Sequence, residues 1–308
     1  MDDRFERLDE VKKDRGVDAF LLASPATVRY LGGYFYNFEI GPSPFQLIPA
    51  SLFIDSSRDA RMIIADSEDT STVDPRISVT HYASYTYEKP LDPSGSFLER
   101  LCGLIDEFGA SRVRLGIESG SLPSVVYEAL TYRYPGIMFV DVSADTARIR
   151  MIKEPDEIAS IRNAVRLCDI GQAAAMKHAA PGITELELFI LIRGEMELAA
   201  GQRFPLMADL VSGERTAATG GSPSKRVIET GDLVLSDLTP CLNGYWGDTC
   251  TTFAVGSAGT DGKRKDFQLV GEALDAGIHA VRPGARACDV DRAMRALING
   301  SGSFPHHG

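Results

Sequence analysis

Two aspartates stand in apolar segments of the chain, where a β-strand normally carries only hydrocarbon side chains. Asp237 closes the segment LVLSD, and Asp248 follows the aromatic pair YW after one glycine. Between them, Asn243 and Gly244 are typical of a tight two-residue hairpin turn. On the two strands of such a hairpin the aspartates can face each other if the register allows it.

Two carboxylates side by side repel each other, so both stay ionised only beside a cation. Oxygen donors suit hard or borderline divalent metals such as Mn²⁺ or Mg²⁺. Two such ions roughly 3.5–4 Å apart can activate a bridging water and polarise a carbonyl. A plainer interpretation also fits, in which Asp237 ends a strand and Asp248 belongs to a turn. The pair therefore indicates a metal site but does not complete one, because a dinuclear centre needs further ligands.

The first half of the chain alternates apolar segments of strand length with amphipathic helical segments, which predicts an α/β layer structure. The expected strands cover residues 18–24, 50–65 (as a hairpin), 77–85, 112–118 and 136–142. The expected helices cover residues 2–15, 96–108 and 122–134, with a turn and a short helix within residues 24–34.

A different pattern begins near residue 148, where we place a boundary between one domain of residues 1–148 and another of residues 149–308. A long helical segment has Pro155 in its first turn, and Thr184 with Glu187 forms a capping box that opens a second helix. The apolar spacing of the long helix predicts a buried face. That face would consist of Ile158, Ile161, Val165, Cys168 and Ala175. Strands follow, and then two further helices, so this half is predicted to be α+β with antiparallel pairing.

Composition excludes several classes of function. The 308 residues carry a net charge of −11, which disfavours nucleic-acid or anionic-membrane binding because carboxylates repel phosphate. No apolar run reaches the roughly 20 residues that a membrane-spanning helix needs. Five scattered cysteines without a CxxC motif argue against a disulfide framework or a zinc ribbon, and favour a reducing cytoplasm.

The segment GDLVLSDLTPCLNGYWGDTCTTFAVG resembles the metal-binding hairpin of the metallopeptidase family that contains methionine aminopeptidase, aminopeptidase P and prolidase. Other segments match that family in order and spacing: RIRMIKEPDEIASIRNAVRLCD, PGITELEL, SGERTAATGGSPSKRVIETGD and AVRPGARACDVDRAMR. The first half resembles the creatinase-type N-terminal domain of the prolidase and aminopeptidase P branch. The resemblance covers nearly the whole chain.

This resemblance implies an α/β creatinase-like domain followed by an α+β domain with the pita-bread fold. The implied reaction is metal-dependent hydrolysis of the bond before proline in a small peptide, in a homodimeric enzyme. Asp237 would ligate one of two divalent ions (Mn, Co or Zn), and Asp248 would bridge both. No catalytic acid or base is identified.

The sequence departs from the family pattern at two places. Gly220 stands where the family commonly has a histidine that binds substrate or moves a proton. The C-terminal GSFPHHG looks like the start of a family motif in which His306 is a substrate-side histidine, and the remaining three metal ligands would follow beyond Gly308. We therefore expect a pita-bread domain that is incomplete at its C-terminus. We also expect weak metal binding, or none, and little or no activity from this chain.

Two other functions stay open. One is a creatinase-like amidinohydrolase, which works without metal but relies on a histidine base at the position of Gly220. The other is a non-catalytic module that binds peptides or proteins on the same fold.

Overall fold

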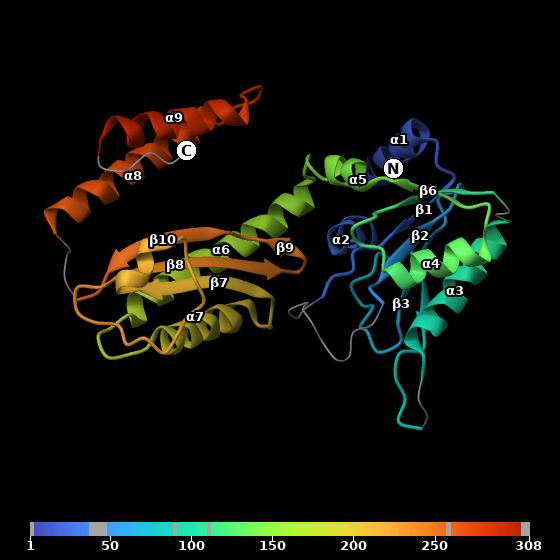
Figure 1. Cartoon of the computed structure of the whole chain (residues 1–308), viewed down its shortest axis with the longest axis horizontal. Helices are drawn as coiled ribbons and strands as arrows, with labels where there is room; N and C mark the ends of the chain where they lie inside the picture. Colours follow the sequence, from blue (N-terminus) through green and yellow to red (C-terminus); the bar gives the residue numbers. More distant parts are fainter. Residues whose placement is uncertain (1–2, 37–47, 89–90, 110–111, 257–259, 303–308) are drawn as a thin grey trace. The chain divides into compact units, whose positions relative to one another are not determined.

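The computed structural model describes residues 3–36, 48–88, 91–109, 112–256 and 260–302. It forms two compact units, each discontinuous in sequence (Figure 1). Unit 1 comprises Met1–Gly171, Arg193–Met207 and Leu238–Thr249, and unit 2 comprises Gln172–Ile192, Ala208–Asp237 and Cys250–Gly308. The domain boundary at residue 148 stays a prediction.

Unit 1 is built on a six-stranded mixed sheet with the order β4-β3-β2-β1-β5-β6. Its strands are β1 (Ala19–Leu22), β2 (Ser51–Ile54), β3 (Ala60–Ala65), β4 (Ser78–Tyr82), β5 (Arg114–Ile117) and β6 (Met138–Asp141). β2 pairs antiparallel with both β1 and β3, whereas β1–β5, β5–β6 and β3–β4 are parallel. The predicted strands and the predicted β2–β3 hairpin are therefore present.

Helices cover both faces of this sheet. They are α1 (Asp3–Arg15), α2 (Pro25–Gly32), α3 (Pro93–Phe108), α4 (Ser124–Arg133) and α5 (Ser143–Ile149). Successive residues of β1 belong alternately to two buried clusters, because neighbouring side chains of a strand point to opposite faces. One cluster includes residues of α1 and α2, and the other includes residues of α3 and α4. The first part of the chain is thus the predicted α/β layer structure.

The later elements begin with two helices, α6 (Pro155–His178) and α7 (Glu185–Ala200). The predicted capping box opens α7, where the Thr184 backbone N–H donates to a Glu187 carboxylate oxygen at 2.7 Å and the Glu187 N–H donates to Thr184 Oγ1 at 3.1 Å. After β7 (Leu206–Ser212) comes a 3₁₀ turn (Gly213–Ala217), and the last helices among the described residues are α8 (Asp261–Ala280) and α9 (Ala287–Gly300).

A second sheet has the order β10-β8-β7, with the short strand β9 also paired to β8. Its other strands are β8 (Leu233–Leu242), β9 (Tyr245–Trp246) and β10 (Thr249–Ala254). β8 and β9 are antiparallel, with Leu242 opposite Tyr245. Asn243 and Gly244 join them with φ of +52° and +81°. Positive φ at both central residues defines the tight turn that the Asn-Gly pair predicted.

Across the part of the chain that the structure describes, no helix is both long enough and apolar enough to cross a bilayer.

Candidate active site

β8 has one buried face and one partly exposed face. Val234, Ser236 and Leu238 are fully buried, while Asp237 between them is half-buried. This alternation is the period of two expected of a strand with one face on the core. The carboxylate of Asp237 therefore belongs to the accessible face of the sheet, as the metal-site prediction requires.

Asp248 is placed by a close backbone contact between the hairpin and α6. A Cβ at Gly247 would lie 2.7 Å from the carbonyl carbon and oxygen of Ala164, so only glycine fits there. The Gly247 N–H also donates to the Pro240 carbonyl at 2.9 Å. One residue later, the Asp248 carboxylate accepts a hydrogen bond from Thr239 Oγ1 at 3.2 Å. The backbone on which Asp248 stands is thus fixed by packing.

Asp237 falls in unit 2 and Asp248 in unit 1, so a shared metal site stays a prediction. Within the described residues, no three side chains of His, Cys, Asp or Glu are grouped to hold a metal ion. The two carboxylates offer the oxygen donors that Mn²⁺ or Mg²⁺ prefers, so they fit part of such a centre. A divalent ion bound there would polarise a substrate carbonyl and lower the pKa of a bound water.

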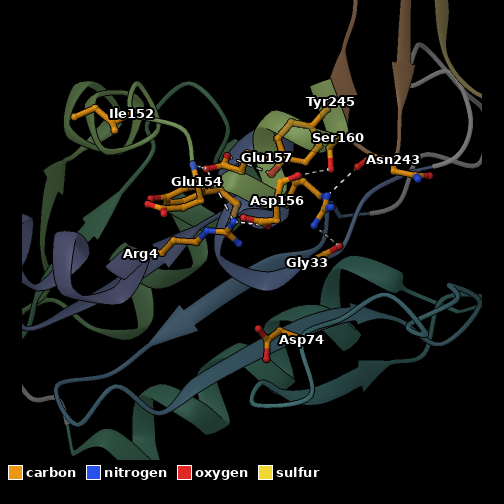
Figure 2. A network of polar contacts seen from close by, with 12 residues as sticks. Arg4, Gly33, Asp74, Ile152, Glu154, Asp156, Glu157, Ser160, Asn243 and Tyr245 are labelled. Atoms are coloured by element: carbon orange, nitrogen blue, oxygen red, sulfur yellow. Dashed lines mark hydrogen bonds and ion pairs between the residues drawn. The ribbon is translucent and has the colours of Figure 1, made fainter. Parts of the chain in front are cut away.

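The tip of the β8–β9 hairpin is held by an arginine of α2. Arg29 Nε donates to the Asn243 carbonyl at 2.8 Å, and its guanidinium lies 5.0 Å from the centre of the Tyr245 ring. The Tyr245 hydroxyl donates to the buried carboxylate of Glu157 at 3.2 Å (Figure 2). Burial, and then the charge of Glu157, raise the pKa of Tyr245 to about 12. Tyr245 therefore stays a hydrogen-bond donor at neutral pH.

The start of α6 is tied to α1 by ion pairs in the same network (Figure 2). Arg4 donates to the Asp156 carboxylate at 2.6 Å and lies 4.0 Å from the Glu157 carboxylate. Arg7 pairs with Glu154. Burial alone would raise the pKa of Asp156, but the hydrogen bond and charge of Arg4 outweigh it and lower the pKa. Through Glu157, this network connects α1 to the hairpin tip.

In unit 2, the buried carboxylate of Glu185 holds the loop that follows β7. It accepts the N–H and hydroxyl of Ser212 at 2.7 and 2.8 Å, and those of Ser224 at 3.0 and 2.6 Å. It also pairs with Arg215. Burial alone would raise the pKa of Glu185, but the hydrogen bonds from Ser224 and Ser212 outweigh it and lower the pKa. Glu185 therefore fixes both ends of the segment that contains Gly220.

Gly220 lies against a carboxylate. A Cβ at this position would be 2.0 Å from Asp209 Oδ2 and 2.8 Å from its Cγ. The φ of Gly220 is +134° and that of Gly221 is +155°, backbone conformations that L side chains rarely adopt. The Leu210 N–H donates to the Gly221 carbonyl at 3.0 Å, which binds this segment to the edge of β7. A histidine at position 220 would therefore require both the loop and Asp209 to move.

The sequence analysis did not single out Asp209 or Glu185 as candidate site residues. It did single out His306, which lies outside the described residues. Asp209 is a lone carboxylate in an apolar segment, the same signal that singled out Asp237, and could have been found by it. Glu185 gave no such signal, because its partners are 27 and 39 residues away.

Comparisons with known proteins agree with a two-domain hydrolase of the metallopeptidase type. Residues 4–152 match the Creatinase/Prolidase N-terminal domain, and residues 159–308 match Metallopeptidase family M24. The chain therefore belongs to metallopeptidase family M24 and carries a creatinase/prolidase-type N-terminal domain.

Similar proteins include a Xaa-Pro dipeptidase of Pyrococcus furiosus, 25% identical over 298 residues that cover 97% of this chain and 77% of the relative. The putative dipeptidase YkvY of Bacillus subtilis is 29% identical over 62% of this chain, a match that spans 53% of YkvY.

Solved structures share the fold. The prolidase of Pyrococcus horikoshii OT3 superimposes with a TM-score of 0.76 at 25% identity, covering 98% of this chain and 78% of that structure. A Xaa-Pro dipeptidase from Bacillus anthracis gives a TM-score of 0.78 at 23% identity, covering 97% and 78%. The predicted creatinase-like and pita-bread domains are thus confirmed.

Proposed function

We propose that this protein hydrolyses the peptide bond before proline in small peptides, using divalent metal ions bound in part by Asp237 and Asp248. The observation that carries the proposal is the hairpin itself. It presents Asp237 on the accessible face of β8, and it fixes the backbone at Asp248 through the Gly247 contact with α6. The family and its Xaa-Pro dipeptidase relatives support the same reaction.

In this proposal Asp237 binds one ion and Asp248 bridges two, with manganese as the first metal to test and cobalt and zinc as alternatives. His306 acts on the substrate side. We further propose a homodimer and a reducing cytoplasmic location, the latter because all five cysteines are free thiols. Metal binding, peptide binding and hydrolysis are separate properties, so each has to be measured separately.

The amidinohydrolase alternative finds no support in the loop after β7. That reaction relies on a histidine base where this chain has Gly220, and the carboxylate of Asp209 occupies the space next to it. A peptide-binding module without catalysis remains the alternative against which the experiment is designed.

The experiment measures two quantities on the purified chain, with Mn²⁺ and with a chelator. Calorimetry gives the affinity for Ala-Pro, and chromatography gives the release of free proline. Asp237→Asn and Asp248→Asn should each abolish metal-dependent peptide binding and any hydrolysis. Glu214→Gln serves as the control, because Glu214 is an exposed carboxylate whose contact with Arg226 is a distant 3.9 Å ion pair.

Peptide binding that requires Mn²⁺, with proline release that both aspartate variants lose, supports the proposed function. Ala-Pro that binds equally well with chelator and is never cut contradicts it, and indicates a binding module instead.

A further inference from the structure

The register of β7 against β8 places an additional carboxylate beside Asp237. The Cys241 N–H donates to the Pro205 carbonyl at 2.8 Å. At the other end of the pair, a Cβ at Gly213 would lie 3.0 Å from a carboxylate oxygen of Asp232. The strands therefore run antiparallel. Counting four residues along each strand from the Cys241–Pro205 bond brings Asp209 opposite Asp237.

Residues directly opposite each other in an antiparallel pair project from the same face of the sheet. The burial pattern agrees, because Leu206 and Leu210 of β7 are buried like Leu238 of β8, whereas Asp209 and Asp237 are both half-buried. Asp209 thus belongs to the accessible face that carries the proposed metal ligand.

The surroundings of Asp209 leave its carboxylate available. Its neighbour across the loop is Gly220, which has no side chain to donate a hydrogen bond or to cover it. Within the described part of the chain, no hydrogen bond or ion pair is formed by the Asp209 carboxylate. The Glu185 hydrogen bonds hold both ends of the Gly220 segment, so the position of Gly220 against Asp209 is part of the folded structure.

A half-buried carboxylate next to another carboxylate favours a positively charged partner, both by charge and as a hydrogen-bond acceptor. Building on the proposed function, we propose that Asp209 is a specificity-determining residue that binds a cationic nitrogen of the peptide substrate. That nitrogen is either the free α-ammonium group or the ammonium group of a basic side chain. Gly220 permits this arrangement, because a side chain at position 220 would collide with the carboxylate of Asp209.

The test compares dipeptide affinities of the wild-type chain and Asp209→Asn, which keeps the shape and removes the charge. Two matched peptide pairs separate the two sources of charge. Ala-Pro against N-acetyl-Ala-Pro reports on the α-ammonium group, and Lys-Pro against norleucyl-Pro reports on the side chain. Calorimetric dissociation constants are measured with Mn²⁺, and Glu214→Gln controls for the general loss of one negative charge. The melting temperature checks that Asp209→Asn folds.

We expect wild-type protein to favour the charged member of one pair by about tenfold or more, the range of a charge-assisted hydrogen bond. Asp209→Asn should lose this preference and Glu214→Gln should keep it. Asp209→Asn should still bind Mn²⁺ more tightly than Asp237→Asn does, because it loses a neighbouring charge and not a metal ligand. An unchanged preference in Asp209→Asn, no preference in the wild type, or no peptide binding at all overturns the proposal. A Mn²⁺ affinity in Asp209→Asn as low as that of Asp237→Asn also overturns it, because Asp209 would then be a metal ligand.

The proposed function can fail separately. A charge preference that Asp209→Asn removes, in a protein that never releases proline, supports the role of Asp209 and contradicts hydrolysis. Proline release with no charge preference supports hydrolysis and contradicts the role of Asp209.

Discussion

Replacing Glu185 with glutamine changes one carboxylate oxygen into an NH₂ group and leaves the size of the side chain the same. The glutamine will keep its oxygen toward Ser224 and Arg215, because a backbone N–H and a guanidinium both need an acceptor there. Its NH₂ group then faces Ser212, whose hydroxyl can rotate to accept a hydrogen bond. The backbone N–H of Ser212 cannot, and it is left unpaired in a fully buried position.

An unpaired buried N–H costs about 1–3 kcal/mol. The pair with Arg215 also loses its negative charge, which adds about 1 kcal/mol, since Arg215 is a third exposed and partly screened. We therefore expect Glu185→Gln to destabilise unit 2 by about 3 kcal/mol. For a unit of this size that lowers the melting temperature by roughly 9–18 °C. Glu187→Gln is the matched control, because glutamine serves in a capping box as well as glutamate does.

The pH dependence makes this prediction specific to the charge. The pKa of Glu185 is lower in the folded protein than in the unfolded chain. Its stabilisation is therefore fully present above the unfolded pKa, near about 4.3, and is lost as the pH falls through the folded value. Melting temperatures of wild type and Glu185→Gln should differ most at pH 7 and converge at acidic pH. Equal stability at pH 7, or a gap that stays constant down to about pH 3, would refute the role assigned to the carboxylate.

Three further substitutions test the packing around the site. Gly220→Ala should destabilise unit 2 by about 1–3 kcal/mol, because the φ of Gly220 is +134° and the new Cβ would collide with Asp209. In denaturant unfolding, the double variant Gly220→Ala/Asp209→Ala should recover part of this loss. Arg29→Ala should lower the free energy of unfolding by about 2 kcal/mol, because it removes the hydrogen bond to the hairpin turn and the stacking on Tyr245. Amide hydrogens of residues 241–247 should exchange faster in this variant, and Arg29→Lys should restore little of the loss. Gly247→Ala should push the hairpin from α6 and lower Mn²⁺ affinity in calorimetry, and unchanged affinity would show that this contact does not position Asp248.

Local signals in the sequence predicted most of the elements. The capping box of α7 and the Asn-Gly turn act over four residues or fewer, so the interactions that form them lie within a short segment. The family resemblance added the two folds, and it is the source of the metal-binding role proposed for Asp237 and Asp248. Neither source required knowledge of which distant segments touch.

The buried face of α6 shows where local signals fail. Apolar spacing placed Ile158 and Val165 on that face, but they are 39% and 41% exposed. Ala164 is fully buried instead, because the hairpin backbone at Gly247 packs directly on it. Gly171 likewise faces Leu238 closely, where a Cβ would be 2.6 Å from a methyl group. A close approach of backbones favours small side chains, and a pattern that counts only large apolar residues cannot detect it.

Asp209 and Gly220 together show why a departure from a family pattern has to be interpreted in three dimensions. In the sequence, Gly220 indicates only that a histidine is missing. In the structure, the space where that side chain would begin is taken by the carboxylate of Asp209. This residue lies eleven positions earlier, on the accessible face of β7. The group next to this position is therefore an acid and not an imidazole ring. An imidazole can share a proton with its partner, whereas a carboxylate favours a partner that carries a positive charge, which is the basis of the role proposed for Asp209.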